Sequence, residues 1–203
     1  EGGINVASVK WLQELSELGH EFDILLIIDD IQVGNGRTGT FFSFERAGIK
    51  PDMVCMSKSI GGGLPMAILL MRPELDQWQP GEHTGTFRGN NLAFVAAAQA
   101  LTYWENDDFA ESVKYKGAIM EEELGKIAEK YPQLDIELRG LGMVWGLDIP
   151  RPGFAGEVSK EAFANNLIIE LAGADDDVVK FLPALTIEEE TLREGLALID
   201  KAI

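Results

Sequence analysis

The sequence contains a single cysteine, Cys55, and two histidines among its 203 residues. One cysteine excludes an internal disulfide and a structural zinc site built from thiolates, and it is compatible with a reducing compartment. His20 and His83 have no partner at metal-ligand spacing. The sequence therefore implies no metal ion, and we expect a soluble protein of the cytoplasm.

Long apolar runs and positive charge are also scarce. The apolar stretch at residues 24–28 is far too short to cross a bilayer, and no basic-then-apolar leader opens the sequence. Lys and Arg number 17 against 34 Asp and Glu, which gives a formal net charge of −17. This balance argues against nucleic acid or an anionic membrane as a partner, because both attract clustered Lys and Arg. The excess of carboxylates would suit high salt, so a halophilic source is one hypothesis.

The first half of the chain has the pattern of an α/β protein. Apolar residues at helical spacing predict a helix that begins near Val9. The continuous run at 24–28 predicts a strand in a sheet covered on both faces, and 53–56 and 66–71 predict two further strands. An asparagine, Asn90 or Asn91, is expected to cap an alanine-rich helix.

From about residue 106 the pattern changes to a smaller α+β unit. The expected elements are a long charged helix to Tyr131, a strand pair near 136–138 and 143–145, a helix at 157–166, strands at 167–170 and 178–182, and a helix from Glu188. We therefore expect two domains, at residues 1–105 and 106–203. The abrupt start, without an initiator methionine, suggests a piece of a longer protein.

Lys58 is the most informative candidate for chemistry. The apolar segment at 53–56 leads directly to Lys58 and then to three glycines at 61–63, where a cofactor or substrate can approach the backbone closely. Partial desolvation there would favour the neutral amine, which is the form that attacks an aldehyde. A lysine that simply points into water is the alternative, and this segment alone favours that alternative.

Asp29 follows the apolar run at 24–28, and open α/β sheets bind their ligands at the carboxyl ends of their strands. A carboxylate there can keep a heteroaromatic nitrogen protonated, as pyridoxal phosphate requires. Ile31 would then face the ring, and Gln32 could bond to a ring substituent. The plain alternative is an aspartate that starts a turn.

The glycines Gly34, Gly36 and Gly39 match the spacing of the dinucleotide-binding fingerprint. In a true case these glycines join a strand directly to a long helix. Here five residues intervene after the strand, and an aromatic segment follows at 41–44. We interpret the match as accidental, although it supports a nicotinamide-dependent oxidoreductase as a rival function.

Thr86 precedes the alanine-rich helix, so its hydroxyl and the nearby backbone N–H groups could meet a phosphate at a helix N-terminus. Ordinary turn chemistry explains the segment nearly as well.

Three segments together resemble the class III aminotransferases in order and spacing: IIDDIQVGNGRTG at 27–39, SKSIGGGLP at 57–65 and TFRGN at 86–90. The resemblance covers essentially the whole chain, which corresponds to the carboxyl-terminal half of such a protein. It implies the fold of fold-type-I pyridoxal-phosphate enzymes: part of a large, mostly parallel-sheet domain and a small α+β domain.

The resemblance also implies a role for each candidate residue. Lys58 matches the lysine that forms the Schiff base with pyridoxal phosphate, and Asp29 matches the partner of the pyridinium nitrogen. Ile31 matches the residue that packs on the ring, and Gln32 lies near its phenolic oxygen. Thr86 matches the threonine that reaches the phosphate of a cofactor held mainly by the neighbouring subunit, so a homodimer or larger homo-oligomer is implied.

The segments at 30–33, 41–48, 81–90 and 179–183 are most similar to the branch of the family that transfers the 4-amino group of L-2,4-diaminobutyrate in ectoine synthesis. Many family members bind a substrate carboxylate with an arginine where this chain has Lys180, which offers a point charge and no bidentate fork. Other ω-aminotransferases, of the acetylornithine, ornithine or 4-aminobutyrate type, and a catalytically silent fragment stay open as alternatives.

Overall fold

The computed structural model describes residues 1–203, which divide into two compact units. The first unit contains residues 7–36 and 40–110, and the second contains residues 1–6, 37–39 and 111–203. The expected domains, 1–105 and 106–203, stay a prediction.

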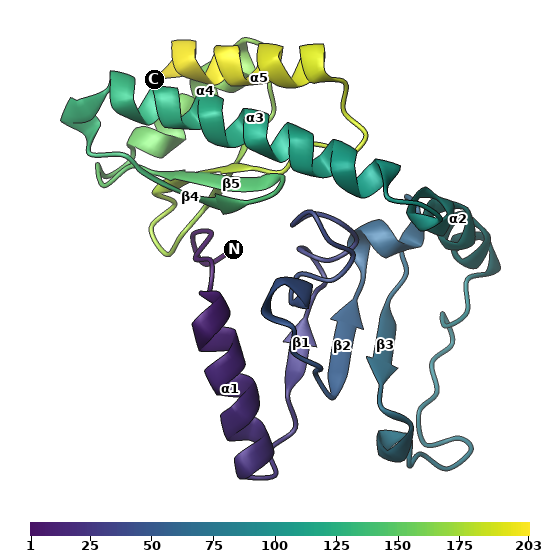
Figure 1. The fold of residues 1–203 in the computed structure, drawn as a ribbon. Helices are drawn as coiled ribbons and strands as arrows, with labels where there is room; N and C mark the ends of the chain where they lie inside the picture. The colour runs from purple at the N-terminus through teal and green to yellow at the C-terminus, as the bar shows by residue number, and fades with distance from the viewer. The chain divides into compact units, whose positions relative to one another are not determined.

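The first unit is built on a three-stranded sheet with the order β1-β2-β3 (Figure 1). β1 runs parallel to β2, and β2 runs antiparallel to β3. The elements are α1 (Val9–Glu21), β1 (Ile27–Asp29), η1 (Glu45–Ala47), β2 (Met53–Met56), η2 (Lys58–Gly61), β3 (Ile68–Met71), η3 (Pro73–Leu75), α2 (Asn91–Leu101) and η4 (Thr102–Trp104). Helices and strands therefore occur in the predicted order.

Side-chain caps explain where the two long helices of this unit begin. The Ser8 hydroxyl accepts from Trp11 N at 3.1 Å, which satisfies a free N–H of α1. The Asn90 carboxamide accepts from Leu92 N and Ala93 N at the start of α2. The expected asparagine cap of the alanine-rich helix is thus confirmed.

The core of the first unit gathers around β2. Phe44, Val54, Met56 and Ile60 are buried together, and further apolar side chains from the neighbouring loop and strands pack against them. The expectation of a strand at 24–28 buried on both faces was wrong. β1 is only three residues long, and its burial alternates: Ile28 packs against the core cluster, whereas Ile27 is 54% exposed, so only one face of the strand is covered.

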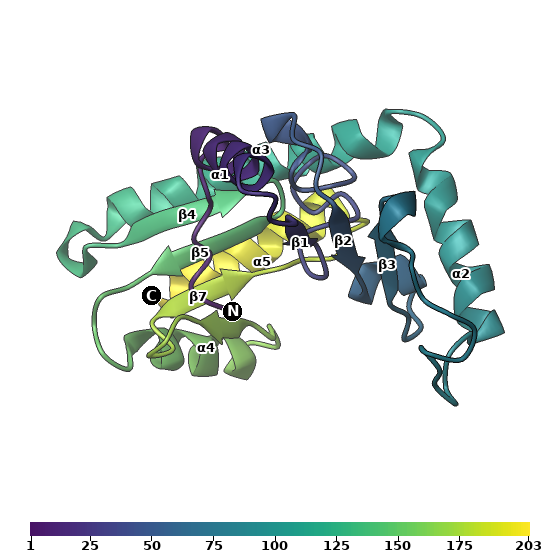
Figure 2. The ribbon, with the colours of Figure 1, turned by 90° about the horizontal axis from the view of Figure 1, so that it is seen from below.

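The second unit contains a four-stranded antiparallel sheet with the order β4-β5-β7-β6. Figures 1 and 2 show α3, α4 and α5 on one face of this sheet. The elements are α3 (Asp108–Lys130), η5 (Pro132–Leu134), β4 (Glu137–Leu141), β5 (Val144–Asp148), α4 (Phe154–Ala164), β6 (Glu170–Ala172), β7 (Val178–Phe181) and α5 (Glu189–Ala202). None of the helices is long and apolar enough to cross a bilayer.

The strand expected at 167–170 begins later than predicted. Leu167 N donates to Ala162 O at 2.9 Å, and Asn166 has a left-handed backbone with φ of 64°. These residues therefore complete the end of α4, and the ladder with β7 starts at Glu170.

Two glycines of α3 differ in what surrounds them. A Cβ at Gly117 would lie 2.7 Å from Gly142 O, so the helix approaches the turn between β4 and β5 at a distance that only glycine permits. A Cβ at Gly125 would meet no atom within 4 Å.

We predict opposite effects of the same substitution at these two positions. Gly117→Ala should lower the free energy of unfolding by about 1–3 kcal/mol, because the added methyl overpacks a backbone contact. Gly125→Ala should raise it by about 0.5–1 kcal/mol through helix propensity. Urea unfolding followed by circular dichroism would measure both, and equal effects at the two positions would contradict the packing described.

Candidate functional site

The parallel pairing of β1 and β2 places two predicted site residues at one edge of the sheet. Asp29 is in register with Cys55, and Lys58 lies three residues after Cys55, just beyond the end of β2. Because the strands are parallel, both carboxyl ends reach the same edge. Asp29 and Lys58, which lie far apart in the sequence, therefore belong to one region of the molecule.

Asp29 is exposed at the end of β1. Its Oδ1 accepts from Ile31 N at 3.0 Å, so the carboxylate starts the turn that follows the strand. Ile31 and Gln32, which are half-buried, lie in this turn. Asp29 can start this turn and also bind a ligand, because an exposed carboxylate has further lone pairs available.

The neighbouring carboxylate, Asp30, has a different environment. It is only 2% exposed, and it accepts from Ser43 N at 3.0 Å and from the Ser43 hydroxyl. Burial raises the pKa of the Asp30 carboxyl, while the two bonds from Ser43 act in the opposite direction. Asp30 O also accepts from Gly34 N at 3.0 Å. Asp30 therefore anchors the loop, and Asp29 is the carboxylate available to a ligand.

Lys58 has an unusual backbone and an exposed side chain. Its φ is 52°, in the left-handed region that non-glycine residues rarely occupy. The preceding residue, Ser57, donates its hydroxyl to Met66 O at 2.6 Å across the loop. A Cβ at Gly62 would lie 2.6 Å from Ala96 O, so the glycine segment rests directly on α2. The loop thus presents an accessible amine from a closely packed backbone.

A cavity of about 1050 Å³ opens beside Lys58. The walls come from the turn after β1, the end of β2, the start of β3, the loop before α2 and α2 itself. The lining residues are Ile31, Cys55, Met56, Ser57, Lys58, Pro65, Met66, Ala67, Ile68, Leu69, His83, Phe87, Arg88, Gly89, Asn90, Ala93 and Phe94. Of the predicted site residues, the structure brings Lys58 and Ile31 together in this cavity, and Asp29, Gln32 and Thr86 are not part of its lining.

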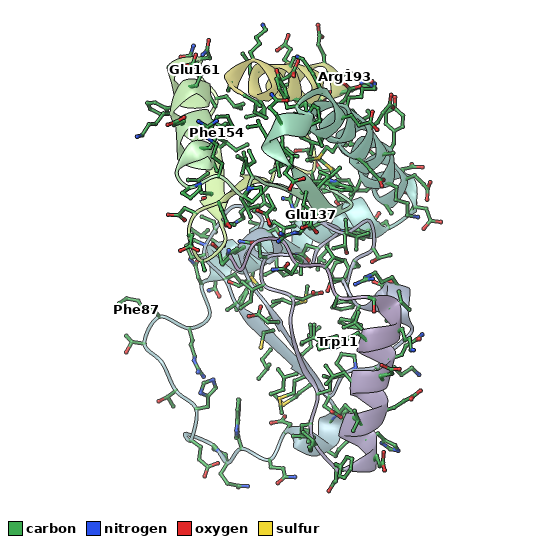
Figure 3. The ribbon with its side chains drawn as sticks, turned by 90° about the vertical axis from the view of Figure 1, so that its left-hand side faces the viewer. Trp11, Phe87, Glu137, Phe154, Glu161 and Arg193 are labelled. Atoms are coloured by element: carbon green, nitrogen blue, oxygen red, sulfur yellow. The ribbon has the colours of Figure 1, made fainter.

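The segment around Thr86 is exposed along its whole length. Figure 3 shows Phe87, the next residue, pointing away from the rest of the chain, and it is 99% exposed. Arg88 folds back locally, where it donates to His83 O at 2.7 Å. Contacts within this chain therefore do not explain the position of Thr86.

The glycine-rich segment at 34–39 is a folded loop. Gly36 N donates to Phe41 O at 3.4 Å, and the next helical residues are those of the short η1, which begins at Glu45. A dinucleotide fingerprint needs a helix directly after its glycines to present N–H groups to a pyrophosphate. This loop lacks that helix, which counts against the oxidoreductase reading.

Lys180 is buried on β7 of the second unit, with 1% of its side chain exposed. Its Nζ lies 2.8 Å from Glu1 Oε1 and 3.3 Å from Glu170 Oε2. Glu170 is its register partner on β6. Sequence reasoning missed both carboxylates; strand pairing between 167–170 and 178–182 was the one available signal for Glu170, and nothing in the sequence pointed to Glu1.

Comparison with known proteins gives a consistent result. The family model described as aminotransferase class-III matches residues 1–203. The chain is 60% identical over 203 residues to a diaminobutyrate–2-oxoglutarate transaminase of Wolinella succinogenes. This match covers 100% of this chain and 48% of that protein. It is 54% identical over 204 residues to the enzyme of the same name from Oceanobacillus iheyensis, again with 48% of that protein covered. The chain thus spans about half the length of these relatives.

Solved structures support the same fold. An N-acetylornithine aminotransferase from Stenotrophomonas maltophilia superposes with a TM-score of 0.86 at 32% identity, over 98% of this chain and 52% of that one. The ornithine aminotransferase of Toxoplasma gondii gives a TM-score of 0.90 at 28% identity, over 98% of this chain and 48% of that one. The expected fold is thereby confirmed.

The environment of Asp30 predicts a pH-dependent substitution effect. Ser43→Ala should lower the free energy of unfolding by about 1.5–3 kcal/mol near pH 7, because a buried carboxylate loses a hydroxyl donor. Removing that donor raises the already raised pKa of Asp30 further. A raised pKa in the folded state favours folding when Asp30 is protonated, and this contribution is lost as the pH rises through the folded pKa. The cost of Ser43→Ala should therefore shrink towards about pH 4.

Urea unfolding at the two pH values would measure this effect. Thr40→Ala is the matched control, because the Thr40 hydroxyl donates to Phe42 O at 2.7 Å and meets no carboxylate. The cost of Thr40→Ala should be the same at both pH values. A cost of Ser43→Ala that is also independent of pH would contradict the ionised, buried state of Asp30.

Proposed function

Because the chain belongs to the class-III aminotransferases, we propose that it is part of a pyridoxal-phosphate-dependent enzyme that transfers an amino group from L-2,4-diaminobutyrate to 2-oxoglutarate. The products would be aspartate 4-semialdehyde and glutamate, and the reverse reaction would consume them. The names of the relatives from Wolinella succinogenes and Oceanobacillus iheyensis support this choice of substrates.

One observation carries the proposal: Lys58 presents an exposed amine to a cavity of about 1050 Å³, at the sheet edge where Asp29 also ends its strand. Class-III aminotransferases use pyridoxal phosphate, and an amine, a carboxylate and an apolar wall are the groups that this cofactor needs. The residues present therefore fit the cofactor.

Pyridoxal phosphate supplies an aldehyde for the amine and a ring that withdraws electrons. The Lys58 Nζ would attach to the cofactor, leave it when a substrate amine arrives, and then move a proton at the substrate carbon as a general base. The Asp29 carboxylate would keep the ring nitrogen protonated. Ile31 would pack against the ring, and Gln32 would bond to a ring oxygen.

Lys180 is the candidate for binding a substrate carboxylate. Its two partners, Glu1 and Glu170, have side chains that are 78% and 70% exposed, so either can be released to water at little cost. A carboxylate of 2-oxoglutarate would then replace one of them at the Lys180 ammonium. Lysine provides a single point charge there, so we expect weaker positioning than an arginine fork would give.

We further propose that the protein works as a homodimer or larger homo-oligomer, with Thr86 reaching the cofactor phosphate of a second copy. The exposure of the segment supports this: Phe87 is 99%, Leu92 72% and Val95 71% exposed, and apolar side chains of this kind are typical of interfaces. A role in ectoine synthesis, a halophilic source and a cytoplasmic location complete the proposal. The net charge of −17 supports the halophilic source.

Another amino donor is the second candidate. The solved structures named above are acetylornithine and ornithine aminotransferases, and this chain shares their fold with TM-scores of 0.86 and 0.90. A few pocket residues decide between such donors. The alternative is therefore the same chemistry on a longer or acylated diamine.

Turnover by the full-length protein tests the proposal. We expect transfer from L-2,4-diaminobutyrate to 2-oxoglutarate, measured as glutamate formed, to exceed transfer from ornithine, acetylornithine and 4-aminobutyrate. Lys58→Ala should reduce this rate at least about a hundredfold, because one amine has both proposed roles. Preference for ornithine or acetylornithine would select the second candidate, and turnover that survives Lys58→Ala would reject the assignment of Lys58.

Lys180→Met tests the carboxylate site. The variant should raise the KM for 2-oxoglutarate about tenfold or more through loss of a charge-assisted contact, with little change in the KM for the amino donor. Methionine keeps the volume of the buried chain, and the side chains of Glu1 and Glu170 are 78% and 70% exposed, so water solvates them in the variant.

Lys116→Met provides the control, because Lys116 is a buried lysine of the same unit that donates to Leu185 O and Ile187 O. This variant should lower stability but leave both KM values unchanged. Equal KM changes in the two variants would show that Lys180 contributes only to folding.

A further inference from the structure

We propose that Asn35 is a positioning residue for Lys58 and that it acts through the hydroxyl of Ser59. This inference rests on the proposed function of Lys58 as the residue that attaches the cofactor. It gives the glycine-rich loop, which otherwise has no assigned role, a specific task at the site.

The contact is direct and part-buried, with a buried donor residue and an exposed acceptor residue. Asn35 Nδ2 donates to Ser59 Oγ at 3.1 Å, and Asn35 is only 9% exposed. Ser59 is the residue after Lys58, and the residue before it, Ser57, donates its own hydroxyl to Met66 O at 2.6 Å. Lys58 is therefore held on both sides by a hydroxyl group, with its side chain free between the two contacts.

The backbone of Lys58 needs this support. With φ of 52°, the residue occupies a region that is unfavourable for a side chain with a Cβ, and such a conformation persists only where the surroundings fix it. Rotation of φ to an ordinary negative value would turn the Cα–Cβ bond and move the amine away from the cavity. Fixing Ser59 prevents that rotation.

Asparagine suits the other end of the contact. Asn35 itself has φ of 54°, and asparagine tolerates the left-handed region better than most residues. Its amide is almost completely removed from water, where a donor without an acceptor would be unfavourable. The Ser59 hydroxyl supplies that acceptor from a segment 24 residues away in the sequence.

The rate at which the full-length apoprotein attaches pyridoxal phosphate through Lys58 tests this role. The rate constant would be followed by absorbance across a range of pH, with the signal of Lys58→Ala subtracted. The variants are Asn35→Gly, which removes the amide and tolerates the positive φ, Ser59→Ala, and the double variant.

We expect each single variant to lower the plateau rate constant about five- to tenfold, with the pH midpoint unchanged, because one hydrogen bond that orients the amine is lost. The double variant should be no slower than the slower single variant, since both changes remove one contact. Hydrogen exchange of the apoprotein should also become faster at residues 57–62, without a matching loss in the midpoint of global unfolding.

Ser159→Ala is the matched control, because the Ser159 hydroxyl donates to Ile169 O at 3.1 Å in the second unit. It should leave the rate constant unchanged. Plateau rates equal to that of the natural protein in both single variants, or additive losses in the double variant, would overturn the role of Asn35. If Asn35→Gly does not fold, Ser59→Ala alone tests the role of Asn35, and the same fall in the plateau rate constant is expected. Absence of attachment at Lys58 in the unsubstituted protein would instead reject the proposed function itself.

Discussion

The parallel pairing of β1 with β2 is the constraint on which the candidate site depends. The register that joins Asp29 to Cys55 sends both chains out of the sheet at the same edge, one as the turn at Ile31 and the other as the loop at Lys58. Side chains alternate between the two faces of a strand, so a slip of one residue would exchange the faces of one whole strand. The buried pair Val54 and Met56 resists such a slip, because both side chains belong to the core cluster.

The loop around Lys58 shows what the sequence could predict and what it could not. Local signals were sufficient for the strand before Lys58, the glycines after it and the cap at Asn90, because each depends on neighbouring residues. The contact from Asn35 to Ser59 spans 24 residues, and that from Lys180 to Glu1 spans 179, so both depend on the tertiary fold. The exposure of β1 was missed for a related reason: an apolar run does not reveal how many strands and helices of the same chain cover it.

Two buried charged residues, Asp30 beside Asp29 and the predicted site residue Lys180, are stabilised by different kinds of partner. Asp30 is kept in place by neutral donors from Ser43, and its burial raises the pKa of its carboxyl. Lys180 is instead paired with two exposed carboxylates. The first arrangement fixes a loop, because neither partner can leave without exposing an unpaired buried group. The second can exchange partners, because its carboxylates are already in contact with water. This difference agrees with the proposed role of Lys180 in ligand binding and with the structural role of Asp30.

The central claim is that Lys58 carries the cofactor, and covalent trapping tests it most directly. The full-length protein would be mixed with pyridoxal phosphate, reduced with borohydride and mapped by peptide mass spectrometry. The account predicts a single pyridoxyl group on Lys58, with the other lysines unlabelled. Label spread over surface lysines, or none at Lys58, would contradict it.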